Sequence, residues 1–196
     1  MNPAANLILI GPMGAGKSCI GRRLAQRFGM PLIDIDREIE RGAGASVAAI
    51  FDAEGEEGFR ARETLALGHA LGHTLGHTLK TGGSVVATGG GAVLAAGNRD
   101  HLQRRGFVVH LHVSVAEQLQ RLRRDTTRPL LAREDREDLL QAMAALRTPL
   151  YALVADLRFD TDHLRADHAE RELAALLQQR WQRCTPATVR PGQAQP

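Results

Sequence analysis

Short apolar runs alternate along this chain with longer segments in which apolar residues recur every three or four positions. A short apolar run is typical of a buried strand, whereas the longer spacing is typical of a helix that packs one face on a sheet. Strands are expected at residues 7–10, 32–34, 84–87, 107–111 and 157–160. Helices are expected at residues 19–28, 46–52, 56–80, 99–105, 115–123, 135–154 and 167–183. This order predicts an α/β fold in three layers, with a five-stranded parallel sheet flanked by helices.

The length of 196 residues is enough for one α/β domain with a buried core. We expect this domain to cover residues 1–184. Residues 185–196 are rich in Pro, Gly and Gln and show no periodicity, which predicts a disordered tail. Ligands of open parallel sheets bind at the carboxyl ends of the strands, so candidate chemistry is sought in the segments that follow the predicted strands.

Composition narrows the classes of partner. A net charge of +3 and a pI near 9.4 suit either nucleic acid or small anionic substrates. One Trp, one Tyr and five Phe are too few for a base-stacking platform, so small anions are favoured and no nucleic acid is expected. Two cysteines, Cys19 and Cys184, argue against a disulfide framework and for a reducing compartment. With no secretory signal pattern and no apolar stretch of membrane-spanning length, a cytoplasmic location without a membrane partner is expected.

The octet GPMGAGKS at residues 11–18 directly follows the first predicted strand and fits the phosphate-binding pattern G-x-x-x-x-G-K-[ST]. Its glycines let successive backbone N–H groups point at phosphate oxygens, and the following helix aims its positive end at the same anion. Lys17 would reach the β- and γ-phosphates, and Ser18 would bind Mg²⁺. A glycine-rich turn without a ligand is the alternative, which the flanking strand and helix disfavour.

Two carboxylates, Asp34 and Asp36, end the second predicted strand. Residues two apart in a strand point to the same side, so both can face one cleft. Beside a phosphate loop such a pair can hold Mg²⁺ through water and accept a proton from an attacking hydroxyl. The alternative is a solvated turn or a helix N-cap before Arg37.

Two further motifs carry candidate binding groups. In FRARE, Arg60 can grip a carboxylate in bidentate fashion while Glu63, three positions later, holds it in place. The glycines at 89–91 follow the third strand and allow N–H groups to approach a ligand closely. A solvated helix face and a merely flexible loop are the respective alternatives.

Two arginines precede prolines in the second half of the chain. Arg128 belongs to RPLL, in a charged loop suited to a mobile lid that brings a cation onto a transferring phosphoryl group. Arg147 belongs to RTPLY, where a proline interrupts a helical pattern and can re-aim the arginine. Each alone could equally be a surface residue.

Taken together, the motifs GPMGAGKS, DID, FRARE, GGGA, RPLL and RTPLY resemble the shikimate kinases, a family of the nucleoside-monophosphate-kinase-like P-loop kinases. The resemblance runs from residue 6 to residue 160. It implies a P-loop kinase fold with a substrate-binding segment at about 35–63 and a lid at about 123–136. It also implies transfer of the γ-phosphoryl group of ATP, with Mg²⁺, to the 3-hydroxyl of shikimate, in the pathway to chorismate and aromatic amino acids. A monomer is expected.

The same resemblance assigns residue roles. Nucleotide contacts fall on Gly11, Met13, Gly14, Ala15, Gly16, Lys17, Ser18, Cys19, Arg121 and Arg128, with Arg121 placed like the family's adenine-stacking arginine. The metal would be held by Ser18 and Asp34. Acceptor contacts fall on Asp36, Arg60, Gly89, Gly90, Gly91 and Arg147. Lys17, Asp36 and Arg128 are the expected catalytic residues.

Two features depart from the family pattern. Cys19 stands where the family usually has Thr. Residues 67–78 form a repeat, LGHA-LGHT-LGHT, where the family is shorter. Its three histidines, His69, His73 and His77, are spaced like ligands on one helix face, but a single straight helix cannot easily close a four-coordinate shell. We therefore expect the repeat to lengthen a helix, with its leucines packed inward and its histidines in solvent.

Two other functions stay open at this point. Gluconate kinases share the phosphate loop and a small hydroxy-acid substrate, although RPLL and FRARE speak against them. A P-loop ATPase that serves as a regulatory or nucleic-acid-binding switch would suit the basic pI but leaves Asp36, Arg60 and Arg147 unexplained.

Overall fold

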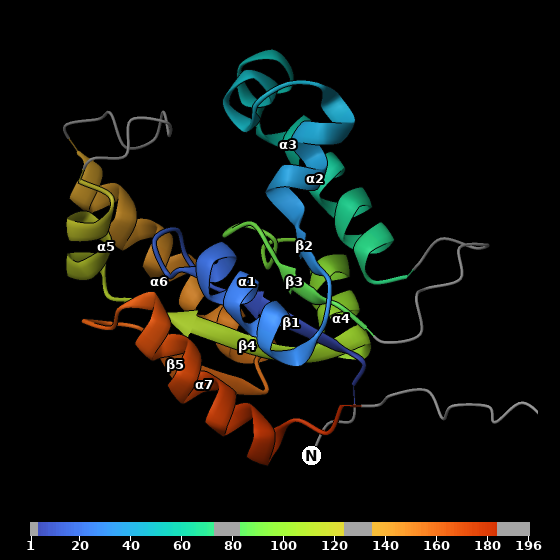
Figure 1. Cartoon of the computed structure of the whole chain (residues 1–196). Helices are drawn as coiled ribbons and strands as arrows, with labels where there is room; N and C mark the ends of the chain where they lie inside the picture. Colours follow the sequence, from blue (N-terminus) through green and yellow to red (C-terminus); the bar gives the residue numbers. More distant parts are fainter. Residues whose placement is uncertain (1–3, 73–82, 124–134, 184–196) are drawn as a thin grey trace, which may run out of the picture.

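The computed structural model describes residues 4–72, 83–123 and 135–183, and it confirms the predicted α/β class (Figure 1). A parallel five-stranded sheet runs in the order β2-β3-β1-β4-β5. Its strands are β1 (Asn6–Ile10), β2 (Leu32–Asp34), β3 (Val85–Ala87), β4 (Gly106–His112) and β5 (Leu157–Asp160). Because all strands are parallel, their carboxyl ends lie at one edge, where the candidate residues follow them.

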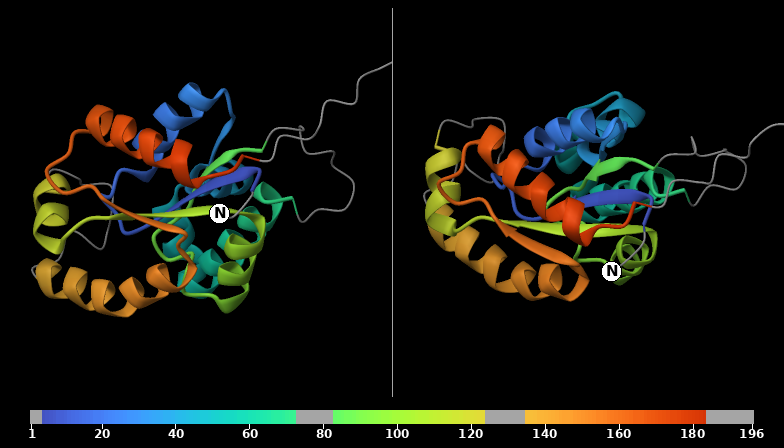
Figure 2. Two further views of the ribbon diagram at one scale, coloured as in Figure 1. Left: turned by 90° about the horizontal axis from the view of Figure 1, so that it is seen from below. Right: turned by 60° about the horizontal axis from the view of Figure 1, so that its bottom comes forward.

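Helices cover both faces of the sheet (Figure 2). Those described are α1 (Lys17–Phe28), α2 (Ile35–Ala43), α3 (Val47–Ala70), α4 (Ala96–Arg105), α5 (Val115–Arg121), α6 (Arg136–Val154) and α7 (Ala166–Arg180). On the central strand, Leu7 and Leu9 face the core formed with α1 and α7, whereas Ile8 and Ile10 face the core formed with α2, α3, α4 and α6. A strand with apolar side chains on both faces belongs between two helical layers, which is why its sequence reads as a continuous apolar run.

The structure corrects the interpretation of the DID segment. We expected both aspartates at the end of one strand, with a helix N-cap before Arg37 as the alternative; β2 ends at Asp34 and Ile35 begins α2, so the alternative is confirmed. Asp34 is the N-cap of α2, where its side chain accepts from the Arg37 amide at 3.4 Å, and Asp36 lies in the first turn. Ile35 and Ile39, four residues apart, are buried against the sheet, and this spacing is the helical signal that the sequence interpretation missed.

The predicted helices at 46–52 and 56–80 are joined as α3, with a break at Gly55 (φ 70°, ψ −173°). The prediction that the second one continues to Lys80 was wrong, because α3 ends at Ala70. There the Leu71 amide donates to the Leu67 carbonyl, and Gly72 adopts a φ of 85° that side chains disfavour.

Several predictions fall outside the described residues. These are the lid apart from its ends, Arg128 within it, His73 and His77 of the repeat, Cys184, and the tail at 185–196. Among the helices that are described, none is long and apolar enough to cross a membrane.

Candidate active site

The phosphate loop connects β1 to α1 at the carboxyl edge of the sheet. Gly11, Gly14 and Gly16 have φ values of 140°, 79° and 89°, which only glycine adopts without strain. A Cβ on Gly11 would lie 2.2 Å from the carbonyl oxygen of Leu111, so β4 leaves no room for a side chain there. Backbone conformation and close packing therefore both require the glycines of this motif.

Lys17 and the start of α1 form the cationic part of the loop. The Lys17 ammonium donates to the carbonyl oxygens of Gly11 at 2.7 Å and Pro12 at 2.8 Å. Gly16 is the N-cap of α1 and supplies no side-chain cap. The first amides of the helix thus meet the loop with their positive end, an arrangement that fits a polyphosphate. Ser18 and Cys19 follow in the first turn and are exposed.

Arg121, at the end of α5, contacts the phosphate loop. Its guanidinium donates to the Gly14 carbonyl at 3.0 Å and to the Thr161 hydroxyl at 3.2 Å, and its Nε donates to Glu117 at 2.9 Å. Thr161 is buried at the end of β5 and donates in turn to the His112 carbonyl at 2.8 Å. Arg121 therefore ties α5 and the β5–α7 connection to the loop, a bracing role that sequence reasoning did not foresee.

The second half of the site lies where α2 and α3 meet the segment after β3. Arg60 of α3 donates from Nη1 to Glu63 at 2.7 Å, as the FRARE motif predicts, and from Nε and Nη2 to Glu56 at 3.3 and 3.1 Å. Glu63 is fully buried, and burial raises the pKa of its carboxyl although Arg60 opposes the rise. The partner Glu56 was not predicted, although its i, i+4 spacing to Arg60 was a usable signal.

Two of the three glycines after β3, Gly89 and Gly91, leave room for these charged side chains. A Cβ on Gly89 would lie 2.3 Å from Glu63 Oε1 and 2.9 Å from Asp36 Oδ1. A Cβ on Gly91 would lie 2.3 to 2.4 Å from the Arg60 guanidinium. These glycines are therefore needed to leave room for Asp36, Arg60 and Glu63. This requirement is separate from any backbone contact that they make with a ligand.

Gly90 joins the two halves of the site. Its Cβ position is 3.5 Å from the Gly11 carbonyl oxygen, 3.6 Å from the Met13 amide nitrogen and 3.7 Å from Arg147 Nη1. The phosphate loop and the Arg60 cluster are thus neighbours, and Arg147 of α6 reaches the same place. Among the described residues, no hydrogen bond joins Asp34 to Ser18, and Asp34 accepts instead from the Arg37 amide.

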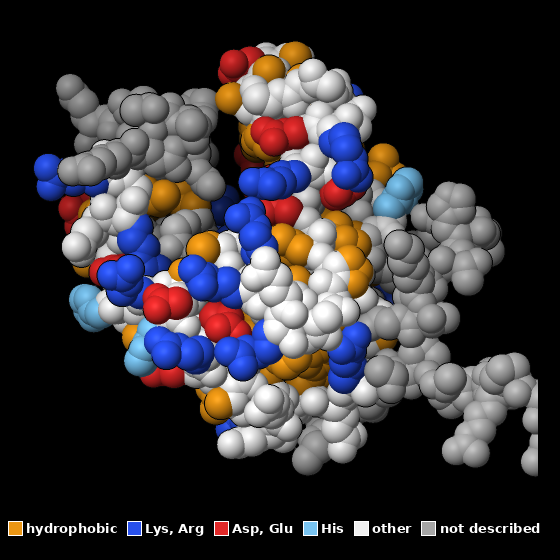
Figure 3. Space-filling view, in the orientation of Figure 1, with side chains coloured by type: hydrophobic (Ala, Val, Ile, Leu, Met, Phe, Trp, Pro, Cys, Tyr) orange, Lys and Arg blue, Asp and Glu red, His pale blue; other side chains and the backbone are white. Residues whose placement is uncertain are grey.

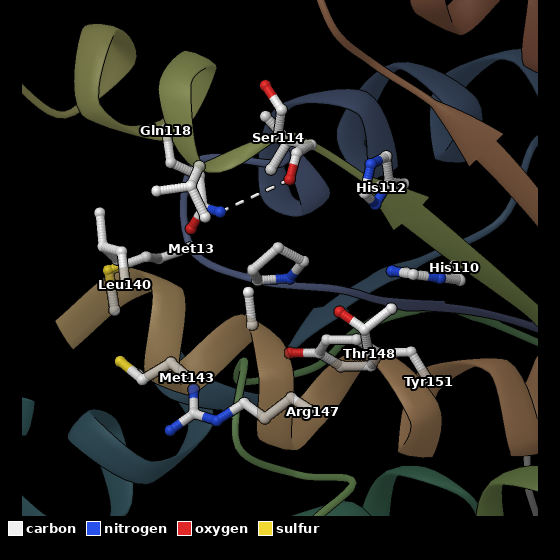
Figure 4. A pocket seen from close by; sticks show the side chains of 14 residues that line it. Met13, His110, His112, Ser114, Gln118, Leu140, Met143, Arg147, Thr148 and Tyr151 are labelled. Carbon is white, nitrogen blue, oxygen red and sulfur yellow. Dashed lines mark hydrogen bonds between the residues drawn. The ribbon is translucent and has the colours of Figure 1, made fainter. Parts of the chain in front are cut away.

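The surface is hollowed between the lobe made by α2 and α3 and the part that carries α5 (Figure 3). Beside the phosphate loop, a pocket of about 110 Å³ lies between the end of β4, α5 and α6 (Figure 4). Met13, Leu140 and Met143 supply apolar walls, and Arg147 lines the same space. Among the described residues, the Arg147 Nε is buried without a hydrogen-bond partner, and the Arg147 side chain also interacts with Tyr151. The site therefore holds a cation at the pocket wall.

His110 is a buried titratable residue that sequence reasoning missed. It pairs with Ile10 in the sheet, and its ring stacks on Tyr151 at 4.7 Å between centroids. Burial, with smaller effects from His112, Arg158 and Lys17, lowers the pKa of His110 to about 4. The imidazole is therefore neutral in the folded protein at pH 7.

We expect this histidine to make the protein acid-labile. The unfolded state takes up the proton near pH 6.5 and the folded state only near pH 4, so the free energy of unfolding falls as the pH drops through this interval. The loss is about 2 kcal/mol at pH 5. Urea unfolding at pH 7 and pH 5 measures it. The pH dependence should shrink in His110→Phe but persist in His69→Gln, which changes an exposed histidine; equal slopes in all three proteins would contradict the assignment.

In the described part of the repeat, Leu67 and Leu71 are buried and His69 is exposed, as predicted. The predicted helical extension is absent at Leu71 and Gly72, where α3 has ended.

Comparison with known proteins identifies relatives over nearly the whole chain. The family model described as Shikimate kinase matches residues 13–178. A shikimate kinase from Xanthomonas campestris pv. campestris is 55% identical over 181 residues, covering 92% of this chain and 96% of that protein. The solved structure of shikimate kinase from Acinetobacter baumannii in complex with shikimate has a TM-score of 0.80 and 43% identity, covering 90% of this chain and 94% of that one. The structural match confirms the predicted three-layer P-loop kinase fold.

Proposed function

The chain belongs to the shikimate kinase family, and we propose that it transfers the γ-phosphoryl group of ATP to the 3-hydroxyl of shikimate. The observation that carries this proposal is the junction at Gly90, where a phosphate loop meets a cluster of two arginines and two carboxylates. Phosphoryl transfer requires mainly positioning and neutralisation of charge, and this junction supplies both in one place.

The nucleotide half of the site is formed by residues 11–19 together with Arg121. The loop amides and the start of α1 would hold the phosphates, and Lys17 would exchange its two carbonyl contacts for phosphate oxygens. Arg121, which contacts Gly14, lies at the edge of the loop where the rest of the nucleotide would extend. Its stacking on adenine stays a prediction.

We assign Mg²⁺ to Ser18 and Asp34. An exposed hydroxyl in the first turn of α1 and a carboxylate at the carboxyl end of β2 are oxygen ligands, which Mg²⁺ prefers, and Asp34 can act through water. When bound, the ion would offset the charge of the phosphate oxygens. Because Asp34 also caps α2, the same carboxylate links the metal to the helix that carries Asp36.

The acceptor half would use Arg60 and Arg147 to hold the carboxylate of shikimate, and backbone N–H groups of residues 89–91 to hold its polar atoms. Asp36, beside Gly89, would accept the proton of the attacking hydroxyl. Arg128, predicted to bring a cation onto the transferring group, lies outside the described residues, so its role stays a prediction.

A coupled assay of ADP release tests the proposal. ATP and Mg²⁺ are supplied with shikimate, gluconate, nucleoside monophosphates or no acceptor. ADP release that depends on shikimate is expected. Equal release with gluconate would favour the gluconate-kinase alternative, and release independent of any acceptor would favour an ATPase switch. The monomeric state and the cytoplasmic location also stay predictions.

Cys19 offers a test of the nucleotide half that needs no turnover. It is exposed in the first turn of α1, beside Lys17 and Ser18, so a bound nucleotide should cover it. In a Cys184→Ser background, saturating Mg-ATP is expected to slow alkylation of Cys19 by about tenfold or more. Mass spectrometry of the modified residue measures the rate; the same rate with and without nucleotide would remove Cys19 from the binding site.

Gly91→Ala tests the seat of Arg60. The added Cβ would occupy the position of the guanidinium, which can swing away without disturbing the backbone. We expect the KM for shikimate to rise by about tenfold, equivalent to about 1.4 kcal/mol, with little change in the KM for ATP. Gly97→Ala, in open space on α4, is the matched control and should leave both values unchanged. An equal KM for shikimate in the two variants would show that Gly91 is not needed to make room for Arg60.

A further inference from the structure

One buried hydroxyl links the glycine segment to the helix that carries Arg147. Tyr151 of α6 is only 2% exposed, and its hydroxyl donates to the Gly90 carbonyl at 2.5 Å. The two residues are 61 positions apart in the chain. Arg147 lies one helical turn before Tyr151, so both side chains project from the same face of α6 (Figure 4). Tyr151 thus connects α6, the helix that carries Arg147, to the glycine segment at 89–91.

The Gly90 carbonyl sets the direction of a neighbouring donor. This carbonyl and the Gly91 N–H belong to one planar trans peptide group, in which they point to opposite sides. Holding the carbonyl toward Tyr151 therefore holds the Gly91 N–H away from α6. The peptides on either side are held by hydrogen bonds from the Ala92 N–H to the Gly89 carbonyl and from the Leu94 N–H to the Gly91 carbonyl, but glycine at both positions lets the peptide between them adopt more than one orientation.

The Tyr151 ring is itself held in place. It stacks on the His110 ring at an interplanar angle of 29°, and His110 meets His112 edge-on at 5.8 Å. Burial raises the pKa of Tyr151 to about 12, so the hydroxyl keeps its proton and acts as a donor at neutral pH. His110 of β4 thus packs behind the Tyr151 ring and limits its movement.

We infer that Tyr151, backed by His110, is a positioning residue that orients the Gly90–Gly91 peptide for binding of the acceptor. It does not touch the reacting atoms; it acts through the backbone of Gly90, and its side chain also interacts with that of Arg147. This inference rests on the proposed function, because its test measures how variants of Tyr151 and His110 bind shikimate.

Tyr151→Phe removes the hydroxyl and keeps the ring on His110. We expect the KM for shikimate to rise about tenfold, with kcat and the KM for ATP within about twofold of the wild type. Trp181→Phe is the matched control, because it removes a comparable hydrogen bond, from Trp181 Nε1 to the Ala4 carbonyl at 2.9 Å, at the far end of α7. Thermal unfolding of both variants reports their loss of stability.

A selective rise in the KM for shikimate in Tyr151→Phe alone supports the inference. An unchanged KM for shikimate, or equal rises in the KM for both substrates, overturns it. Failure of the proposed function is distinguishable, because then the wild type itself would show no shikimate-dependent release of ADP.

Variants of His110 test whether stacking on this ring holds Tyr151 in place. His110→Ala removes the ring behind the tyrosine and is expected to raise the KM for shikimate about as much as Tyr151→Phe does. His110→Phe restores a ring that can stack, and should return the KM to within about threefold of the wild type. Failure of phenylalanine to rescue, in a variant that folds, would exclude stacking as the function of His110.

Discussion

Replacing Arg60 by alanine is expected to raise the KM for shikimate by about 30- to 1000-fold, with the KM for ATP nearly unchanged. The estimate corresponds to loss of a charge-assisted, bidentate contact worth about 2 to 4 kcal/mol. The effect should be confined to the acceptor because Arg60 lies against Gly91 and Glu63, whereas the phosphate loop is built around Lys17. Steady-state kinetics with each substrate varied in turn measures it.

The Arg60→Ala experiment must separate weaker binding of shikimate from loss of folded protein. Alanine at position 60 leaves Glu63 buried without its cation, which can destabilise the fold. Arg60→Lys keeps the charge and should give an intermediate KM, since a lysine cannot form the bidentate contact. Arg62→Ala is the control, because Arg62 is on the same helix but pairs with Glu54. If Arg62→Ala changes the KM for shikimate as much as Arg60→Ala, the assignment of the clamp fails.

Asp36→Asn is expected to lower kcat by about 100- to 10,000-fold, the range typical of a lost general base. The amide is nearly isosteric with the carboxylate, so binding of shikimate should weaken much less than turnover. Removing a negative charge beside the buried Glu63 should also lower the pKa of that carboxyl, because Asp36 contributes to its rise. Rapid-quench measurement of a single turnover separates the chemical step from product release.

Glu38→Gln provides the comparison for Asp36. It lies in the first turn of the same helix and pairs with Arg41 instead of facing Gly89. Near wild-type kcat in Asp36→Asn would remove Asp36 from the catalytic residues. A large fall in kcat in Glu38→Gln would instead indicate that α2 as a whole is sensitive to loss of charge.

Local patterns predicted the strands and the phosphate loop well. Residues 32–34 and 157–160 were predicted with the bounds that β2 and β5 have, because apolar runs between turn residues are a local signal. The phosphate loop could be predicted equally well, since positive φ angles require glycine at fixed positions of the motif. The FRARE motif predicted the pairing of Arg60 with Glu63 for the same reason, three residues being a helical neighbour distance.

What was missed depends on contacts between distant segments or on one overlooked short helix, α2. The contact of Arg121 with Gly14 spans 107 positions, and no local pattern reports it. The stacking of His110 on Tyr151 likewise arises only when α6 packs on the sheet. For α2, the interpretation as a strand end assumed that Asp34 and Asp36 share one conformation, whereas Asp34 starts a helix.

The contacts of Lys17 have a consequence for nucleotide binding. An ammonium that already binds two carbonyls of its own loop acts as a cross-link, keeping the loop in its curved form before any anion arrives. The conformational entropy of ordering the loop is then lost during folding, and the nucleotide need not compensate for it on binding. In return, a phosphate gains from Lys17 only the difference between a carbonyl contact and a phosphate contact. The nucleotide therefore gains less from Lys17 than it would from an ammonium without contacts in the free protein.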